Sequence, residues 1–155
     1  MQFRLPALLR FLQLLWAVTH ALDTTSKRMA RELGITGPQR LVLRLVGLFP
    51  GIAAGELSTI MHVHPSTLTG VLRRLVDRRL LERVADRADS RRAVLRLKPL
   101  GTRLLETTRG TAEAAAEEVL RQLSRRERLV IAQVLMQLAE RLSAHTEPNM
   151  SRRRA

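Results

Sequence analysis

The sequence predicts a mainly α-helical protein with one small β-hairpin, and three features of the 155-residue chain support this. Most apolar residues recur every three or four positions, which is the spacing of one face of a helix. Aromatic residues make up only 3% of the chain, so the core must rest on aliphatic side chains. Residues 81–97 instead form two short strand-like runs around a charged turn, as a β-hairpin does.

Two helices are predicted before residue 53. The first covers residues 5–32, where no glycine interrupts the apolar repeat, and it stops near Gly34. The second starts at Thr36-Gly37-Pro38-Gln39, because Thr36 can cap the helix and Gln39 can complete a capping box. It ends at Pro50-Gly51, and its inward residues are expected to be Leu41, Val42, Leu45, Val46 and Phe49.

A short helix over residues 53–61 is expected to turn Leu57 and Ile60 inward. A tight connection then leads to a helix that begins at Pro65 and runs to about Leu80. Two helices joined in this way form a helix-turn-helix. The second helix has an apolar side made of Leu68, Val71, Leu72 and Leu75, which leaves other faces to Ser66, Thr67, Thr69, Arg73 and Arg74.

The C-terminal third is expected to be helical after the hairpin. Pro99 starts a helix that should continue through the alanine-rich stretch to about Leu123. Ser124-Arg125-Arg126-Glu127 is a capping box for a last helix. Its apolar stripe has two sides, which indicates a partner helix, and consists of Val130, Ile131, Val134, Leu135, Leu138 and Leu142. Residues 147–155 read as a basic tail.

The charge indicates a polyanionic partner, either nucleic acid or an anionic membrane surface. The net charge is +13, and residues 62–98 alone contain ten basic and four acidic residues. The apolar segment over residues 5–18 is interrupted by Arg10 and Gln13, so neither a membrane span nor a signal peptide is expected. The chain contains no cysteine, which excludes disulfides and thiol switches and is compatible with a cytoplasmic protein.

The second helix of the helix-turn-helix has the residues that reading duplex DNA requires. The major groove admits one helix, and short side chains near its start let the backbone approach the base edges. Ser66, Thr67 and Thr69 meet that need. Arg73 and Arg74, one turn later, can reach guanine edges or phosphates. The alternative to DNA contact is that the hydroxyl residues only cap the first turn and that the arginines only face solvent.

The hairpin turn, residues 86–92, offers a second contact with DNA. An arginine at a hairpin tip can enter a narrow minor groove, where the negative potential is strongest. Arg91 is the first choice, with Arg87 and Arg92 beside it. We expect Asp89 to orient Arg91 or Arg92 through a charge-assisted hydrogen bond. These arginines could also form only weak surface ion pairs.

Four segments together give a resemblance that covers nearly the whole chain. They are Ile35-Thr36-Gly37-Pro38-Gln39, Gly55-Glu56-Leu57, His64-Pro65-Ser66-Thr67-Leu68-Thr69, and the wing pattern Asp89-Ser90-Arg91 followed by Leu97 and Gly101. This combination resembles the MarR family of winged-helix transcription regulators. The resemblance implies an obligate homodimer, built from the first, fifth and sixth helices, that binds a palindromic operator. It also implies a repressor that releases DNA when a small aromatic or anionic effector binds.

The resulting domain prediction is one domain over residues 1–146. It has a winged helix-turn-helix core at about 36–98, and dimerisation helices at about 5–32 and 99–145. One departure from the family is Lys98, which stands where a threonine usually caps the next helix. The fifth helix must therefore be capped differently.

No catalytic or cofactor-binding arrangement emerges. The chain has no phosphate-binding glycine loop, no HExxH and no GxSxG motif, so an enzyme is not expected. His62 and His64 alone are weak evidence for a metal site, and none is expected. Two alternatives to a sequence-specific regulator stay open. One is an architectural DNA-binding protein with little sequence preference, and the other is a helical adaptor whose charge is incidental.

Overall fold

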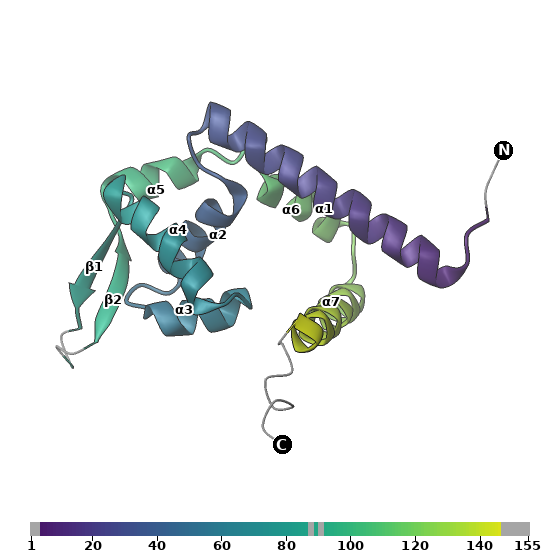
Figure 1. Cartoon of the computed structure of the whole chain (residues 1–155). Coiled ribbons are helices and arrows are strands. Elements are labelled where there is room, and N and C mark those ends of the chain that lie inside the picture. Colours follow the sequence, from purple (N-terminus) through teal and green to yellow (C-terminus); the bar gives the residue numbers. More distant parts are fainter. Residues whose placement is uncertain (1–3, 87–88, 90–91, 147–155) are drawn as a thin grey trace, which may run out of the picture. The chain divides into compact units, whose positions relative to one another are not determined.

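The computed structural model describes residues 4–86, 89 and 92–146, and these ranges contain seven helices and one two-stranded sheet (Figure 1). The mainly helical fold with a small hairpin is thereby confirmed. The chain forms two compact units, which meet at Ala115 and Ala116 in the sequence. The elements are α1 (Ala7–Glu32), α2 (Gly37–Leu48), α3 (Ala54–Met61), α4 (Pro65–Asp77), β1 (Leu81–Ala85), β2 (Ala93–Leu97), α5 (Pro99–Glu106), α6 (Ala112–Arg121) and α7 (Arg125–Thr146).

Local sequence rules correctly predicted several helix ends. Gly34 has a φ of 67°, a left-handed conformation that suits glycine at the end of α1. The Thr36 hydroxyl accepts a hydrogen bond from the Gln39 backbone N–H, and the Gln39 side chain accepts one from the Thr36 N–H. The same reciprocal pair joins Ser124 and Glu127 at the start of α7. Both predicted capping boxes are confirmed.

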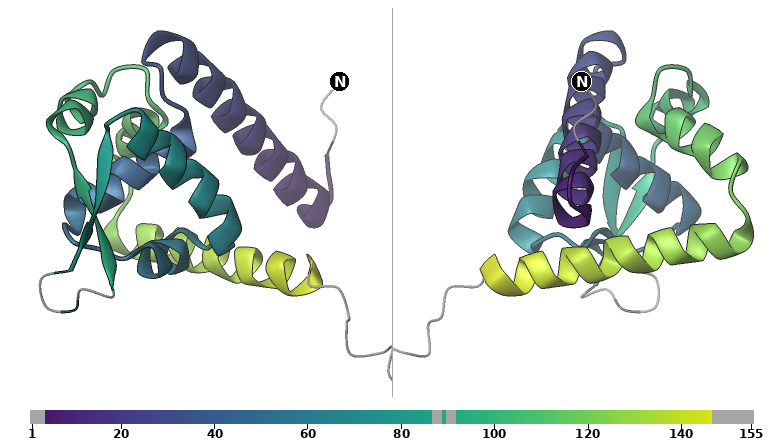
Figure 2. Two further views of the ribbon diagram at one scale, coloured as in Figure 1. Left: turned by 60° about the vertical axis from the view of Figure 1, so that its left-hand side comes forward. Right: turned by 90° about the vertical axis from the view of Figure 1, so that its right-hand side faces the viewer.

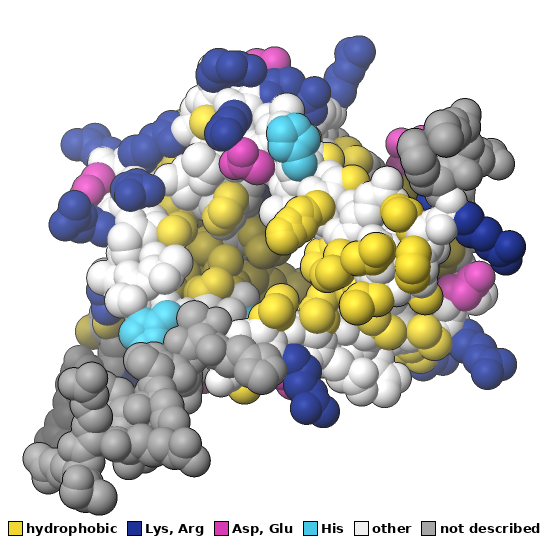
Figure 3. Space-filling view, turned by 45° about the vertical axis from the view of Figure 1, so that its right-hand side comes forward, with side chains coloured by type: hydrophobic (Ala, Val, Ile, Leu, Met, Phe, Trp, Pro, Cys, Tyr) yellow, Lys and Arg dark blue, Asp and Glu magenta, His cyan; other side chains and the backbone are white. Residues whose placement is uncertain are grey.

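Only the C-terminal part of α1 belongs to the core of the first unit, where Met29 is buried. Figure 2 shows the first half of this helix running clear of α2 to α5. The space-filling view shows hydrophobic side chains gathered on one face of the molecule (Figure 3). Trp16 is 62% exposed and Leu8 is 67% exposed. This half of α1 therefore leaves a large apolar surface uncovered.

The core of the first unit is aliphatic, as the composition predicts. It is built from Ile35, Val42, Leu43, Val46, Ile52, Leu57, Leu68, Leu72, Leu75, Leu80, Leu81 and Leu95. Three predictions of inward residues were wrong, since Leu41, Phe49 and Ile60 are all exposed. The buried stripe of α2 passes through Leu43, which lies on the opposite side of the helix from Leu41, because α4, α5 and β2 pack there.

The hairpin is antiparallel, with Leu81 opposite Leu97 and Ala85 opposite Ala93. Residues 93, 95 and 97 are all apolar, but burial along β2 does not alternate with them. Val94 and Leu95 are both buried, whereas Ala93 is exposed. The reason is a third chain segment, because Ala53 forms an isolated bridge with Val94, and Leu95 exchanges backbone hydrogen bonds with Gly51 and Ile52. The segment before α3 thus holds the base of the hairpin against the helices.

The predicted continuous helix from Pro99 to about Leu123 was also wrong. The helix ends at Glu106, and α6 starts at Ala112. Gly110, with a φ of 75°, turns the chain between them. The buried Thr111 hydroxyl then donates to the Thr108 carbonyl and accepts from the Ala114 N–H, which caps the new helix. The stop and start signal is thus the Gly110-Thr111 pair.

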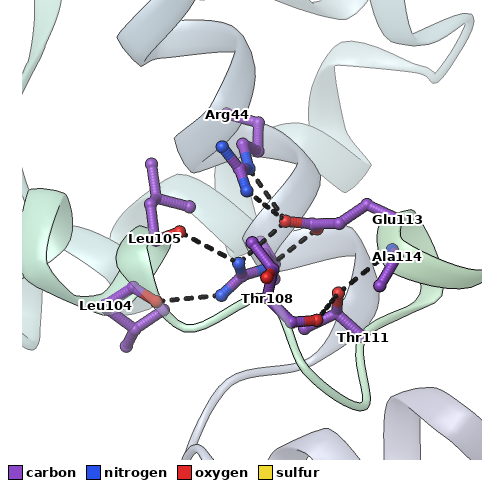
Figure 4. A network of polar contacts seen from close by, with 8 residues as sticks. Arg44, Leu104, Leu105, Thr108, Thr111, Glu113 and Ala114 are labelled. Atoms are coloured by element: carbon purple, nitrogen blue, oxygen red, sulfur yellow. Dashed lines mark hydrogen bonds and ion pairs between the residues drawn. The ribbon is translucent and has the colours of Figure 1, made fainter. Parts of the chain in front are cut away.

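A buried arginine of α2, Arg40, connects this helix to the break, and Figure 4 shows its partners Leu104, Leu105 and Glu113. The Arg40 side chain is only 1% exposed, and its guanidinium binds both carboxylate oxygens of Glu113, with Nε donating to Oε2 at 2.8 Å and Nη2 lying 2.7 Å from Oε1. It also donates to the Leu104 carbonyl at 2.9 Å and the Leu105 carbonyl at 3.3 Å. These carbonyls belong to the last turn of α5, where they lack helical partners. One side chain therefore joins α2, α5 and α6.

The outer side of Glu113 is covered by Arg44, whose Nη2 lies 2.7 Å from Oε1. Partial burial by itself raises the pKa of Glu113. The hydrogen bonds from Arg40 and Arg44 outweigh this effect and hold that pKa below its ordinary value of 4.5. From α1, the Arg28 guanidinium adds a hydrogen bond to the Gly110 carbonyl at 2.9 Å. The α5–α6 connection is thus fastened by arginines from two other helices.

Replacing Glu113 with glutamine should lower the free energy of unfolding by about 2 kcal/mol, because Arg40 stays buried without a counter-charge. Glu118→Gln, an equal change of charge at an exposed position of α6, should have little effect. Denaturant unfolding of both variants measures the difference. Equal stability of the two variants would contradict the role given to the Glu113 carboxylate.

The same carboxylate makes stability depend on pH. Because the folded pKa lies below the ordinary value, the contribution of Glu113 is fully present above pH 4.5 and is lost as the pH falls through the folded value. The loss of stability in acid should therefore be smaller in Glu113→Gln than in the wild type. Unfolding curves between about pH 6 and pH 3 would show this flattening.

Candidate nucleic-acid interface

The helix α4 is amphipathic, with an apolar side and a polar side. Leu68, Leu72 and Leu75 are buried in the core. All five residues that the sequence predicted as base-reading are exposed on the remaining faces, namely Ser66, Thr67, Thr69, Arg73 and Arg74. The helix follows α3 through residues 62–64, where His62 adopts a left-handed φ of 51°. The two helices contact each other in the arrangement of a helix-turn-helix.

The start of α4 is organised by His64. Its Nδ1 accepts a hydrogen bond from the Ser66 backbone N–H at 3.3 Å and lies 2.7 Å from the Ser66 hydroxyl oxygen. Pro65 follows at the first helical position, where a backbone N–H is not needed. The Thr69 hydroxyl donates to the Pro65 carbonyl at 2.9 Å, so its oxygen is left to accept hydrogen bonds. Sequence reasoning identified Ser66 and Thr69 and missed the cap at His64.

The base of the wing is held by Glu56 of α3. Its carboxylate accepts a hydrogen bond from the Ala53 backbone N–H at 2.8 Å, and its Oε2 lies 2.7 Å from Nη2 of Arg92. The hydrogen bond from Ala53 and then that from Arg92 lower the pKa of Glu56 below its ordinary value. Glu56 thus caps α3 and binds the wing at once, a role that sequence reasoning did not foresee.

The structure describes only some of the other residues predicted to contact DNA from the wing. Arg87 and Arg91 lie outside the described residues. Asp89 is exposed, and its backbone carbonyl accepts a hydrogen bond from the Arg92 N–H at 2.9 Å. Arg92 forms an ion pair with Glu56, a partner that the sequence analysis did not propose for it.

Two further basic residues have structural contacts. The Arg78 guanidinium, just after α4, donates to the Gly34 carbonyl and so connects the end of α4 to the α1–α2 junction. Lys98 makes no side-chain cap for α5, as expected from its difference from the family. Pro99 occupies the first helical position instead, and the Lys98 carbonyl accepts from the Thr102 N–H at 3.0 Å. Arg83 and Arg96 are exposed on the two strands.

The described residues contain no group of three or more acidic, histidine or cysteine side chains that could hold a metal ion. In the same ranges, no helix is both long enough and apolar enough to cross a membrane. The exposed side chains of α4 include three hydroxyl and two guanidinium groups, which suit phosphates and base edges.

A helix-turn-helix followed by a two-stranded wing defines the class of winged helix-turn-helix proteins. Comparison with known proteins shows which members of this class the chain is similar to. Residues 33–92 match the family model described as MarR family. A protein of Mycobacterium tuberculosis named as an HTH-type transcriptional repressor is 29% identical over 111 residues, which cover 72% of this chain and 80% of that protein.

Solved structures agree with this fold over most of the chain. MarR itself is 25% identical with a TM-score of 0.62, over 94% of this chain and 96% of that chain. The Staphylococcus aureus MepR–DNA complex is 20% identical with a TM-score of 0.68, over 83% of this chain and 94% of that chain. The Streptomyces coelicolor regulator PcaV, solved with its natural ligand, is 24% identical with a TM-score of 0.67, over 90% and 98%. The chain is therefore similar to the MarR family of transcriptional regulators in both sequence and fold.

The cap on α4 gives a test of how the interface is built. His64→Ala should lower the free energy of unfolding by about 1 kcal/mol, because the Ser66 N–H loses its side-chain acceptor. His64→Asn, which restores a capping oxygen, should recover most of that loss. Thermal unfolding of the two variants makes the comparison. If both variants lose the same stability, the imidazole does not act as the cap.

Proposed function

We propose that this chain is a sequence-specific repressor that binds a palindromic operator as a homodimer. The observation that carries the proposal is the exposed face of α4. It contains three hydroxyl and two guanidinium side chains, and the core of the fold needs none of them. Such a face, on the second helix of a helix-turn-helix, is suited to the major groove.

The roles of the α4 residues follow from their hydrogen-bonding chemistry. The Thr69 oxygen can accept from the amino groups of cytosine or adenine. Ser66 and Thr67 lie in the first turn, where the helix N-terminus also favours phosphate. Arg73 and Arg74 are long enough for guanine edges or for phosphates one turn further along.

On the wing, we propose that Arg91, with Arg87 beside it, contacts the minor groove or its phosphates. Asp89 is proposed to orient Arg91 or Arg92. Arg92 is the residue that fixes the wing to α3, since it is paired with Glu56. It can add a phosphate contact from that position through its remaining donors, because its side chain is 44% exposed.

The dimer is proposed from apolar surface that one copy leaves uncovered. On α1, Leu8, Leu9, Leu12 and Trp16 are exposed. On α7, the predicted stripe is exposed as well except for Leu138, which is half-buried, with Leu135 at 52% and Leu142 at 56%. Apolar area of this extent on a monomer marks an interface. We propose that residues 1–146 form one domain. It has a winged helix-turn-helix core at about 36–98 and dimerisation helices at about 5–32 and 99–145, and a basic tail follows at 147–155.

The repressor reading is supported by the names of the mycobacterial relatives. The PcaV structure holds its natural ligand, and a MepR-like structure holds pseudoligands. We propose by this likeness that a small aromatic or anionic effector releases the present chain from DNA. We further propose that the protein acts in the cytoplasm, where the chromosome is, and has no catalytic activity.

Selection from a random DNA pool tests the function directly. The purified chain should enrich one palindrome, whose half-sites lie roughly 34 to 36 Å apart, as two-fold pairing of two α4 helices requires. The competing proposal is an architectural protein, which the net charge of +13 would equally suit. If the selection enriches no sequence and the chain binds every duplex tightly, the repressor proposal is wrong and the architectural protein takes its place.

Loss of Arg73 should weaken binding to the selected operator. We expect Arg73→Ala to cost about 1 to 3 kcal/mol of binding free energy if the residue reads a base. Should it bind phosphate, the change would instead lower the slope of log affinity against log salt by about one. Arg103→Ala removes the same charge from an exposed site on α5 and should leave operator affinity within about twofold of wild type. A titration at several salt concentrations distinguishes these results.

A charge placed on the apolar stripe of α7 should break the dimer. Leu135→Asp should shift the protein from dimer to monomer in sedimentation, because a buried carboxylate at the interface has no partner. Ser143→Asp places the same residue at an exposed position of α7 outside the stripe and should leave the dimer intact. If Leu135→Asp still sediments as a dimer, the interface does not include this stripe.

A further inference from the structure

The exposed face of α4 is centred on a residue without a side chain. Gly70 lies four residues after Ser66 and four before Arg74, and three residues from Thr67 and Arg73. Positions three and four apart are the nearest neighbours on a helix surface. The buried leucines occupy the opposite side of the helix. Gly70 is thus surrounded by four of the five proposed DNA-contacting residues of α4.

The fold gives no reason for a glycine at this position. Its backbone does not adopt the positive φ that favours glycine, and an added Cβ would meet no heavy atom of the described residues within 4 Å. Gly101 shows the contrast, since a Cβ there would lie 2.3 Å from the Leu80 carbonyl oxygen. Glycine inside a helix is less stable than alanine, because it loses more conformational freedom on folding. The glycine in α4 therefore weakens the helix without a packing gain.

We propose that Gly70 is a positioning residue for operator binding, whose missing side chain lets the α4 backbone lie close to the floor of the major groove. The inference rests on the proposed function. Ser66 and Thr67 have side chains only two atoms long, so they reach base edges only if the backbone itself comes close. A side chain at the centre of the face would project furthest toward the bases and hold the helix away from them.

The same face also marks where the contact ends. Asp77 lies seven residues after Gly70, two turns along the same side of the helix, and it is exposed. A carboxylate there would repel the phosphates if it were inserted into the groove. The close approach is therefore confined to the first two and a half turns of α4, between Ser66 and Arg74.

The test uses the full chain and a matched pair of glycines. Gly55 in α3 is also a helical glycine whose added Cβ would meet nothing within 4 Å in the described chain. Gly70→Ala and Gly55→Ala should both keep or raise the Tm. Gly70→Ala should weaken binding to the selected operator by about tenfold and Gly70→Leu by about a hundredfold, whereas Gly55→Ala should leave it unchanged. Affinity for a scrambled duplex of equal length at low salt should be the same in all four proteins.

Three results would overturn the proposal. Operator affinity of Gly70→Ala equal to wild type would show that close approach does not need the glycine. A fall in the Tm of Gly70→Ala would show that the fold itself requires it. Equal losses on the operator and on the scrambled duplex would show a general docking defect. Failure of the proposed function has a different signature, because the wild type would then enrich no operator at all.

Discussion

The packing of the first compact unit depends on the burial of the Arg40 guanidinium. A charged group that is only 1% exposed is stable only if every donor is matched and a counter-charge is near. Glu113 supplies the charge, and the last carbonyls of α5 supply acceptors that a helix end leaves without partners. The break between α5 and α6 puts both of these groups within reach of α2. The interrupted helix and the buried arginine therefore depend on each other.

Polar contacts fix both ends of α4 and the wing, while the apolar side of α4 packs against the core. His64 fixes the start of α4, and the Arg78 contact with the Gly34 carbonyl fixes the segment after its end. Glu56 connects the start of α3 to the wing through Arg92. From the sequence alone, each of these polar side chains would be expected only to face solvent. Together they orient a helix whose outer face is free to bind DNA.

Rules that act within a few residues predicted much of this protein. The caps at Thr36 and Ser124, the proline at the start of α4 and its apolar side were all correct, because each depends on neighbours within one turn. The errors arose where packing decided the outcome. Leu41 and Phe49 fit a helix repeat but face outward, and Val94 is buried because a third segment covers the hairpin. The break at Gly110-Thr111 was visible in the sequence and was outweighed by the alanine-rich stretch that follows.

The amino-acid sequence alone was enough to predict the helical class, the position of the hairpin, the concentration of positive charge and the small hydroxyl residues that open α4. These are properties of composition and of short-range spacing. Only the tertiary structure decided that Arg40 is buried against Glu113, that Arg92 pairs with Glu56, and that nothing in the described chain fills the space above Gly70. The reason is sequence separation, since Arg40 and Glu113 lie 73 residues apart. No local pattern records which distant side chain will meet a buried charge, or which position will be left empty.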